Sequence, residues 1–199
     1  MLKSSFYKNL SEAGVDEAGR GCLAGPVVAA AVILPKRFTH PVLNDSKMLT
    51  AKQRLSVRED ILKSALCWKV AFISEKEIDE MNILRATWKA MHGALSGLDR
   101  QPGFIIVDGN RFIPYNNIPF QTIVKGDGLY YSIAAASVLA KTARDEYMEM
   151  LHEEYPEYGW NHNKGYATLK HRRAILIHGV TPYHRRSFTL RNNQLVLDF

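Results

Sequence analysis

The stretch GVDEAGRGCLAGPVVAAAVIL, residues 14–34, carries the strongest fold signals in the chain. Residues 12–16 (EAGVD) predict a short strand that ends in an acid. Residues 27–34 (VVAAAVIL) predict a buried strand, because they form a short apolar run that contains β-branched side chains. Asp16 and Glu17 place two negative charges at the point where the first strand is expected to end.

Beyond this stretch, predicted strands and helices follow one another along the chain. Apolar runs predict further strands at residues 67–73, 104–108 and 120–124. Capping signals and helical spacing predict helices at residues 51–65, from 75 to about 95, at 130–155 and at 169–178. Early strands that later mix with helices predict an α/β domain with a mixed sheet.

Length, composition and charge narrow the class of protein. The 199 residues are enough for one domain with a real core, and an apolar content of 46% is typical of a globular protein. The net charge of +6 indicates a polyanionic partner, either nucleic acid or an anionic surface. The sequence contains no run of about 18 apolar residues, so it predicts no membrane span. Cys22 and Cys67 lie far apart and match no metal-binding spacing, so we expect free thiols and a cytoplasmic protein.

Four acidic residues stand at or just after predicted strand ends: Asp16, Glu17, Asp108 and Asp127. Ligands in open α/β sheets bind outside the carboxyl ends of the strands, so these acids could converge on one site. Carboxylates that meet in a buried site repel one another unless a cation joins them, and oxygen ligands favour Mg²⁺ or Mn²⁺. Two such ions about 4 Å apart can promote phosphodiester hydrolysis. Taken singly, each acid is better explained as a solvated strand end or turn, and only their combination favours a metal site.

The pair Asp16 and Glu17 sets a geometric condition. Adjacent residues of a regular strand point to opposite faces of the sheet. The two carboxylates can therefore share one site only if the strand breaks between or just after them. Gly19 makes such a break plausible.

Glycines and basic residues supply candidates for contacts with a nucleic acid. Gly19 and Gly21 would let the backbone approach a ligand, and Arg20 could pair with a phosphate. Lys47 could also contact a phosphate, and Tyr166 stands in a basic stretch as a possible stacking platform. The HRRSF segment at residues 184–188 adds positive charge. A plain turn and a solvated helix face remain the alternatives for these segments.

Taken together, a series of motifs in this order resembles a known family. The motifs are GVDEAGRG, NDSK, EIDEMNI, VDGN, VKGD, IAAASVLAKTARD, HNKGY and HRRSF. They resemble bacterial ribonuclease HII, a type 2 ribonuclease H, over residues 12–188. The resemblance implies a ribonuclease H-like fold in which a mixed five-stranded sheet is flanked by helices. It implies one catalytic domain over residues 1–199, with a helical part from about residue 150 that completes the substrate groove.

The resemblance also implies an activity and partners. The expected enzyme is an endonuclease that cleaves the RNA strand of RNA–DNA hybrids. It also incises DNA duplexes 5′ of single embedded ribonucleotides, leaving 3′-hydroxyl and 5′-phosphate ends, as in ribonucleotide removal from DNA. We expect a monomer without a membrane partner.

Residue roles follow from the same resemblance. The four acids would hold two Mn²⁺ or Mg²⁺ ions and carry the catalysis. Gly19, Arg20 and Gly21 would sense the 2′-hydroxyl of the ribonucleotide, and Tyr166 would stack on the following deoxyribose. Two tyrosines after Asp127 and a short C-terminus depart from the pattern we expect for the family.

Two other functions remain open at this point. The first is that of a ribonuclease HIII, which shares the acids, requires a longer RNA stretch and has an extra N-terminal domain. The second is that of a hybrid-binding protein without catalysis, in which the acids have structural roles. Binding alone should survive metal chelation, whereas cleavage should not.

Overall fold

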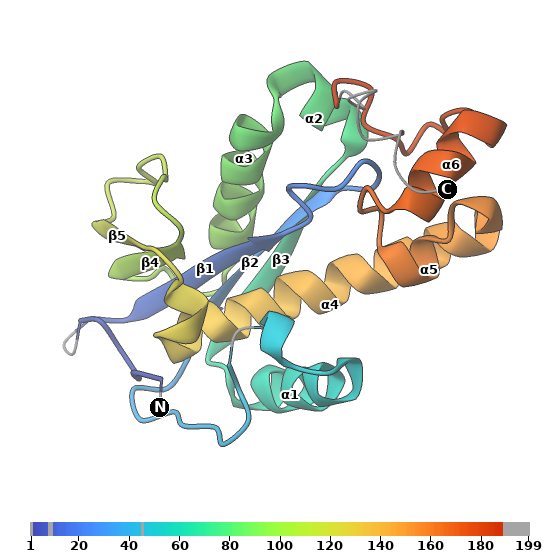
Figure 1. The fold of residues 1–199 in the computed structure, drawn as a ribbon. Coiled ribbons are helices and arrows are strands. Elements are labelled where there is room, and N and C mark those ends of the chain that lie inside the picture. The colour runs from blue at the N-terminus through green and yellow to red at the C-terminus, as the bar shows by residue number, and fades with distance from the viewer. Residues whose placement is uncertain (1, 8–9, 45, 189–199) are drawn as a thin grey trace.

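The computed structural model of the chain describes residues 2–7, 10–44 and 46–188, and its centre is one mixed sheet (Figure 1). The strands are β1 (Glu12–Ala18), β2 (Val27–Ile33), β3 (Cys67–Ile73), β4 (Phe104–Asp108) and β5 (Phe120–Ile123). The five strands have the order β3-β2-β1-β4-β5. β2 is antiparallel to both β1 and β3, whereas β4 is parallel to both β1 and β5. The predicted mixed five-stranded sheet is confirmed.

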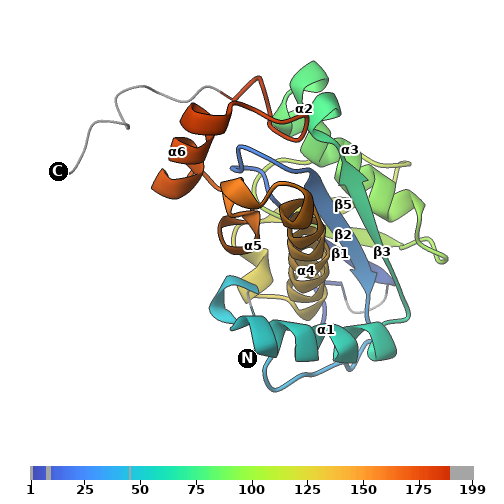
Figure 2. The ribbon, with the colours of Figure 1, turned by 90° about the vertical axis from the view of Figure 1, so that its right-hand side faces the viewer.

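Helices cover both faces of this sheet (Figures 1 and 2). The longer helices are α1 (Ala51–Ser64), α3 (Ile83–Ser96), α4 (Tyr131–Glu154) and α6 (Leu169–His178). The shorter elements are η1 (Ser46–Met48), α2 (Glu75–Met81), η2 (Gly126–Gly128), η3 (Pro156–Tyr158) and α5 (Trp160–Asn163). α3 packs on one face of the sheet, while α4, with α1 beside it, packs on the other. Among the described helices, none is both long and apolar enough to cross a membrane.

The alternation of side chains along β1 decides which face each residue serves. Ala13 and Val15 belong to the core under α3. Gly14 and Asp16 point to the opposite face, where Gly14 lies directly against the backbone of α4. Because β1 is the central strand, its carboxyl end opens onto both layers of helices.

The predicted helix from residue 75 to about 95 is wrong in one respect, because it is two helices. The chain breaks at Asn82, which has a left-handed φ of 70°. The Asn82 side chain accepts hydrogen bonds from the backbone N–H groups of Leu84 (3.0 Å) and Arg85 (3.2 Å) and so caps α3. The apolar stripe continues across the break, which is why spacing alone indicates a single helix.

The C-terminal elements pack against the chain that links β1 to β2. Leu23 and Ala24 share a cluster with Trp160 of α5 and Ile175 of α6. This contact places the α5–α6 region beside the carboxyl end of β1. Residues 189–199, which belong to the tail without a predicted element, lie outside the described residues.

Candidate active site

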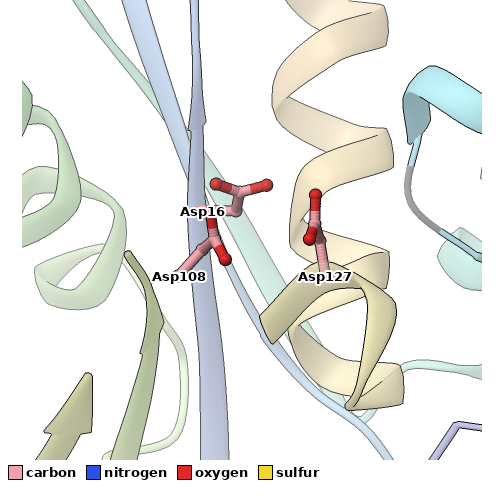
Figure 3. A group of neighbouring side chains, drawn as sticks. All are labelled: Asp16, Asp108 and Asp127. Carbon is pink, nitrogen blue, oxygen red and sulfur yellow. The ribbon is translucent and has the colours of Figure 1, made fainter. Parts of the chain in front are cut away.

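Three aspartates meet where β1 and β4 end and α4 begins (Figure 3). Asp16 is in β1, Asp108 is the last residue of β4 and Asp127 is in η2. One carboxylate oxygen of each lies within 4.8 Å of the corresponding oxygens of the other two. β1 and β4 are parallel neighbours, so their carboxyl ends lie at the same edge of the sheet. The predicted gathering of acids at strand ends is therefore observed for these three residues.

A tight turn brings Asp127 to the other two aspartates. Lys125 adopts a left-handed conformation with φ 57°, which turns the chain sharply after β5. The backbone N–H of Gly126 then donates to Oδ1 of Asp108 at 2.7 Å. Asp127 follows at once, and its Oδ1 accepts from the backbone N–H of Gly128 at 3.0 Å. The Asp108 side chain thus fixes the turn that carries Asp127.

The three carboxylates occupy an environment that is unfavourable for negative charge. Asp16 and Asp127 are each only 4% exposed. Burial raises the pKa of Asp16 well above its ordinary value, and the charges of Glu17 and Asp108 raise it further. Hydrogen bonds from Ser137 and from the Glu17 N–H oppose this shift of the Asp16 pKa only in part. A cation among the three groups removes the repulsion, and a donor set made only of carboxylate oxygens fits a hard divalent ion.

Glu17 does not belong to this group of three. β1 runs without a break through Ala18, which pairs with Val28 of β2. The Glu17 side chain therefore points to the α3 face, opposite to Asp16. Its Oε1 lies 3.1 Å from Nη1 of Arg20. The condition that the strand breaks after Asp16 is not met, although the Glu17 charge still acts on Asp16.

A cavity of about 230 Å³ joins the acids to the other predicted residues. It is lined by Asp16, Glu17, Ala18, Gly19, Arg20, Gly21, Ser46, Asp108, Ser137, Lys141 and Tyr166. Tyr166 is 46% exposed, and burial together with the nearby buried Cys22 raises the pKa of the Tyr166 hydroxyl. Lys47 lies in η1 next to Ser46, and its side chain is outside the described part of the structure. Seven of the nine residues predicted to contact metal or substrate line this cavity. The other two are Asp127, which is not among the lining residues, and Lys47, whose side chain is not described.

The buried side chain of Arg185 supports the Gly-Arg-Gly loop, residues 19–21, through the carbonyl of Arg20. Its guanidinium is 2% exposed and donates from Nη1 to the carbonyl of Arg20 at 3.0 Å. Nε and Nη2 both donate to the carbonyl of Gly25, at 2.9 and 2.7 Å. The prediction that the HRRSF segment adds positive charge for a nucleic acid is wrong for Arg185, because its charge is buried and bound to backbone carbonyls.

Arg144 holds the same loop from α4. It is 1% exposed and donates to the carbonyls of Pro26 (2.9 Å), Ala24 (3.0 Å) and Lys164 (2.8 Å). Gly19 packs directly on this side chain, since a Cβ at Gly19 would lie 2.0 Å from Nε of Arg144. The glycine is required by this close approach as well as by its φ of 95°.

Sequence reasoning missed the polar residues that α4 and η1 present to the site. Ser137 and Lys141 line the cavity, and the Ser137 hydroxyl contacts that of Ser46 at 2.9 Å. Ser137, Lys141 and Arg144 recur at helical spacing in α4, just after its apolar residues 133–136. That spacing places the three side chains along one side of the helix and is the signal that could have identified them.

The comparisons with known proteins identify the family. The family model for ribonuclease HII matches residues 13–191. The chain belongs to the ribonuclease HII family. It is 60% identical to a ribonuclease HII of Bacteroides thetaiotaomicron, with complete coverage of both chains. Among solved structures it is similar to the ribonuclease H2 of Pyrococcus horikoshii, with a TM-score of 0.76, 28% identity and coverage of 89% of this chain and 93% of the other.

The fold of this chain is also similar to that of a ribonuclease HIII. The structure of Bst-RNase HIII in complex with Mn²⁺ matches with a TM-score of 0.60 and 19% identity, covering 90% of this chain and 64% of the other. That likeness concerns the fold alone. As a ribonuclease HII, the protein is a metal-dependent endonuclease that cleaves RNA in RNA–DNA hybrids and incises DNA at embedded ribonucleotides.

Proposed function

We propose that Asp16, Asp108 and Asp127 hold the divalent ion, Mn²⁺ or Mg²⁺, at which this enzyme hydrolyses the phosphodiester. The observation that carries the proposal is the convergence of three carboxylates, two of them almost fully buried, beside a cavity that Asp16 and Asp108 line. Glu17 and Asp108 both line a second hollow on the α3 side of β1. We assign Glu17 and Asp108 to a second ion at this position.

The chain's own residues prepare the site for this chemistry. When two ions are bound, they activate a water and stabilise the leaving 3′ oxygen of the phosphodiester. Asp16 is held in place by the Glu17 N–H at 2.7 Å and by Ser137, while Asp108 is held by the Gly126 N–H. These hydrogen bonds fix the carboxylate oxygens before any ion arrives, which reduces the reorganisation that binding requires.

The Gly-Arg-Gly loop and Tyr166 are proposed to read the sugar of the ribonucleotide. A Cβ at Gly21 would have no heavy atom within 4 Å, so the backbone there is open to a ligand. Arg20 has five N–H donors and uses one on Glu17, which leaves donors for a phosphate oxygen. Tyr166 is partly exposed and lines the same cavity as the Gly-Arg-Gly loop, so its ring can contact the sugar of the ribonucleotide.

The C-terminal helical part is proposed to complete the substrate groove as part of one catalytic domain. It supplies Tyr166 and packs on the segment after the Gly-Arg-Gly loop through Ala24. Lys170 and Arg173 of α6 are exposed and can contact backbone phosphates. Because one chain supplies all of these residues, we expect the monomer to be active.

Cleavage of a labelled DNA duplex that holds one ribonucleotide tests this function directly. We expect incision 5′ of the ribonucleotide with Mg²⁺ or Mn²⁺, ends of the 3′-hydroxyl and 5′-phosphate type, and no incision with chelator. An all-DNA duplex of the same sequence is the control. Cleavage of long hybrids alone would indicate a ribonuclease HIII-like preference. Binding without any cleavage would indicate that the carboxylates are structural.

Replacing Tyr166 by alanine tests the proposed reading of the sugar. We expect cleavage at a single ribonucleotide to fall about 100-fold and cleavage of a long hybrid to fall less than about 10-fold, because a long hybrid offers alternative registers. Tyr7→Ala is a matched control, since Tyr7 is similarly exposed (49%) and lies outside the cavity. The two substrates are compared by kcat/KM. Equal losses on both substrates would remove Tyr166 from junction recognition.

A further inference from the structure

Two buried histidines lie beneath the Tyr166 turn and outside the cavity. His171 of α6 is fully buried, and His184 is 3% exposed. Their Nε2 atoms are 3.2 Å apart. The pair is enclosed by the rings of Tyr158 and Trp160, which pack against both imidazoles. Neither histidine has a part in the metal chemistry proposed above.

The partners of the two rings determine where each proton sits. Nδ1 of His184 accepts from the backbone N–H of Thr181 at 2.9 Å, so His184 carries its proton on Nε2. Nε2 of His171 accepts from the indole N–H of Trp160 at 3.0 Å, because an indole can only donate. His171 therefore carries its proton on Nδ1, where it donates to the carbonyl of Tyr166 at 2.9 Å.

These assignments produce a hydrogen-bond chain with a single direction. It runs from the Thr181 N–H to His184, from the Nε2–H of His184 to Nε2 of His171, and from His171 to the Tyr166 carbonyl. Nε2 of His171 is a shared acceptor, because the indole N–H of Trp160 donates to it as well. Each ring must be neutral. A second proton on His171 would place two N–H donors against each other between the Nε2 atoms, and a second proton on His184 would place an Nδ1–H against the Thr181 N–H. Burial lowers the pKa of both histidines, that of His184 to about 4, which keeps the rings neutral at pH 7.

The chain of hydrogen bonds connects the two segments that face the ribonucleotide. At one end is the Tyr166 carbonyl. Through its backbone, His184 forms a β-bridge with Ala24, and the next residue, Arg185, donates from its guanidinium to the carbonyl of Arg20. Movement within the histidine pair would therefore change the distance between Tyr166 and the Gly-Arg-Gly loop, while the three aspartates stand on separate elements, β1, β4 and η2.

We propose that His171 and His184 are positioning residues for ribonucleotide recognition, which set Tyr166 relative to the Gly-Arg-Gly loop. The inference rests on the role proposed for Tyr166. A positioning role and a purely structural role predict different effects on the two substrates. Loss of a core contact would lower cleavage of all substrates alike. Loss of a contact that positions Tyr166 would lower cleavage at a single embedded ribonucleotide more than cleavage of a long RNA–DNA hybrid.

The test compares three variants of the full chain on the two substrates. His171→Leu removes all of the ring's hydrogen bonds and should lower kcat/KM at a single ribonucleotide about 30-fold, with less than about 3-fold loss on a long hybrid. His171→Asn keeps a donor near the position of Nδ1 and should recover most of that loss. His178→Leu, at an exposed histidine of the same helix, is the control and should change neither value. Equal loss on both substrates for His171→Leu would overturn the proposal.

A double-mutant cycle separates this inference from the proposed function. In a Tyr166→Ala background, His171→Leu should no longer change the ratio of the two substrates, because the group that it positions is absent. If Tyr166→Ala alone leaves the ratio unchanged, the role of Tyr166 fails. If Tyr166→Ala changes the ratio and His171→Leu does not, only the histidine inference fails.

Imidazole ¹⁵N NMR spectra of the wild-type protein supply a readout that does not require a folded variant. We expect His171 in the Nδ1–H form and His184 in the Nε2–H form at pH 7, with His178 as an exposed reference. Observation of the opposite tautomer for either buried ring, or of a charged ring, would break the hydrogen-bond chain and overturn the proposal.

Discussion

Replacing Asp16 with asparagine is expected to abolish cleavage and to make the metal-free protein more stable. The amide removes a metal ligand, so kcat/KM should fall at least about 1,000-fold. It also removes a negative charge that burial, Glu17 and Asp108 all disfavour, as the raised pKa of Asp16 shows. The amide oxygen can still accept from the Glu17 N–H. Cleavage assays with Mn²⁺ and thermal unfolding in chelator measure the two effects.

The stability gained by Asp16→Asn in chelator should depend on pH in a defined direction. A carboxyl whose pKa is raised on folding binds its proton more tightly in the native state, so its contribution to stability is lost as pH rises from the unfolded to the folded pKa. In chelator, the stability gain of Asp16→Asn should therefore grow with pH above about 4 and then level off. Asp99→Asn, at an exposed acid, is the control and should keep wild-type activity. A variant that still cleaves, or that Mg²⁺ stabilises as strongly as the wild type, would contradict the assignment.

Replacing Gly14 with alanine is expected to be the most destabilising small substitution in the central strand. A Cβ at Gly14 would lie 2.2 Å from the carbonyl carbon of Ser132 and 2.4 Å from the backbone nitrogen of Ile133. Both atoms belong to the backbone of α4, so the helix itself must move away from β1. We expect the free energy of unfolding to fall by at least about 3 kcal/mol, as measured by urea denaturation.

Gly93 offers the matched comparison in a helix on the other face of the sheet. A Cβ there would lie 3.1 Å from the side chain of Ala71, on the edge strand β3. The strain of this contact is offset by the higher helix propensity of alanine, so the stability should stay within about 1 kcal/mol of the wild type. If Gly14→Ala were as mild as Gly93→Ala, close packing of α4 on β1 would not be the reason for the glycine.

Local sequence patterns predict much of the fold and part of the site. The short apolar runs around Val28 and Ile106 coincide with strands, and the Thr50 and Ser74 capping signals coincide with helix starts. The acids could be placed together because strand ends meet at one edge of the sheet. This reasoning needs only residue type and chain direction, both of which are local.

The features that local patterns miss are one local break and several contacts between distant segments. Asn82 ends one helix and starts another, although the apolar spacing continues across it. In the sequence, Arg185 is a candidate for a phosphate contact. The structure shows instead that its guanidinium is buried and binds the backbone carbonyls of Arg20 and Gly25. The proton positions of His171 and His184 likewise follow from partners on other segments. The roles of Arg185, His171 and His184 are not encoded in their neighbouring residues.

The pairing of β1 with β4 has a consequence for the order of folding. β1 and β2 can form a hairpin early, because they are close in the sequence. Val15 of β1 and Val107 of β4 are partners that only a large loop closure brings together, and such contacts form slowly. Asp16 and Asp108 become neighbours only in that step. A chain still emerging from the ribosome, with β4 and η2 not yet made, therefore cannot cut RNA, and nuclease activity is confined to the completed sheet.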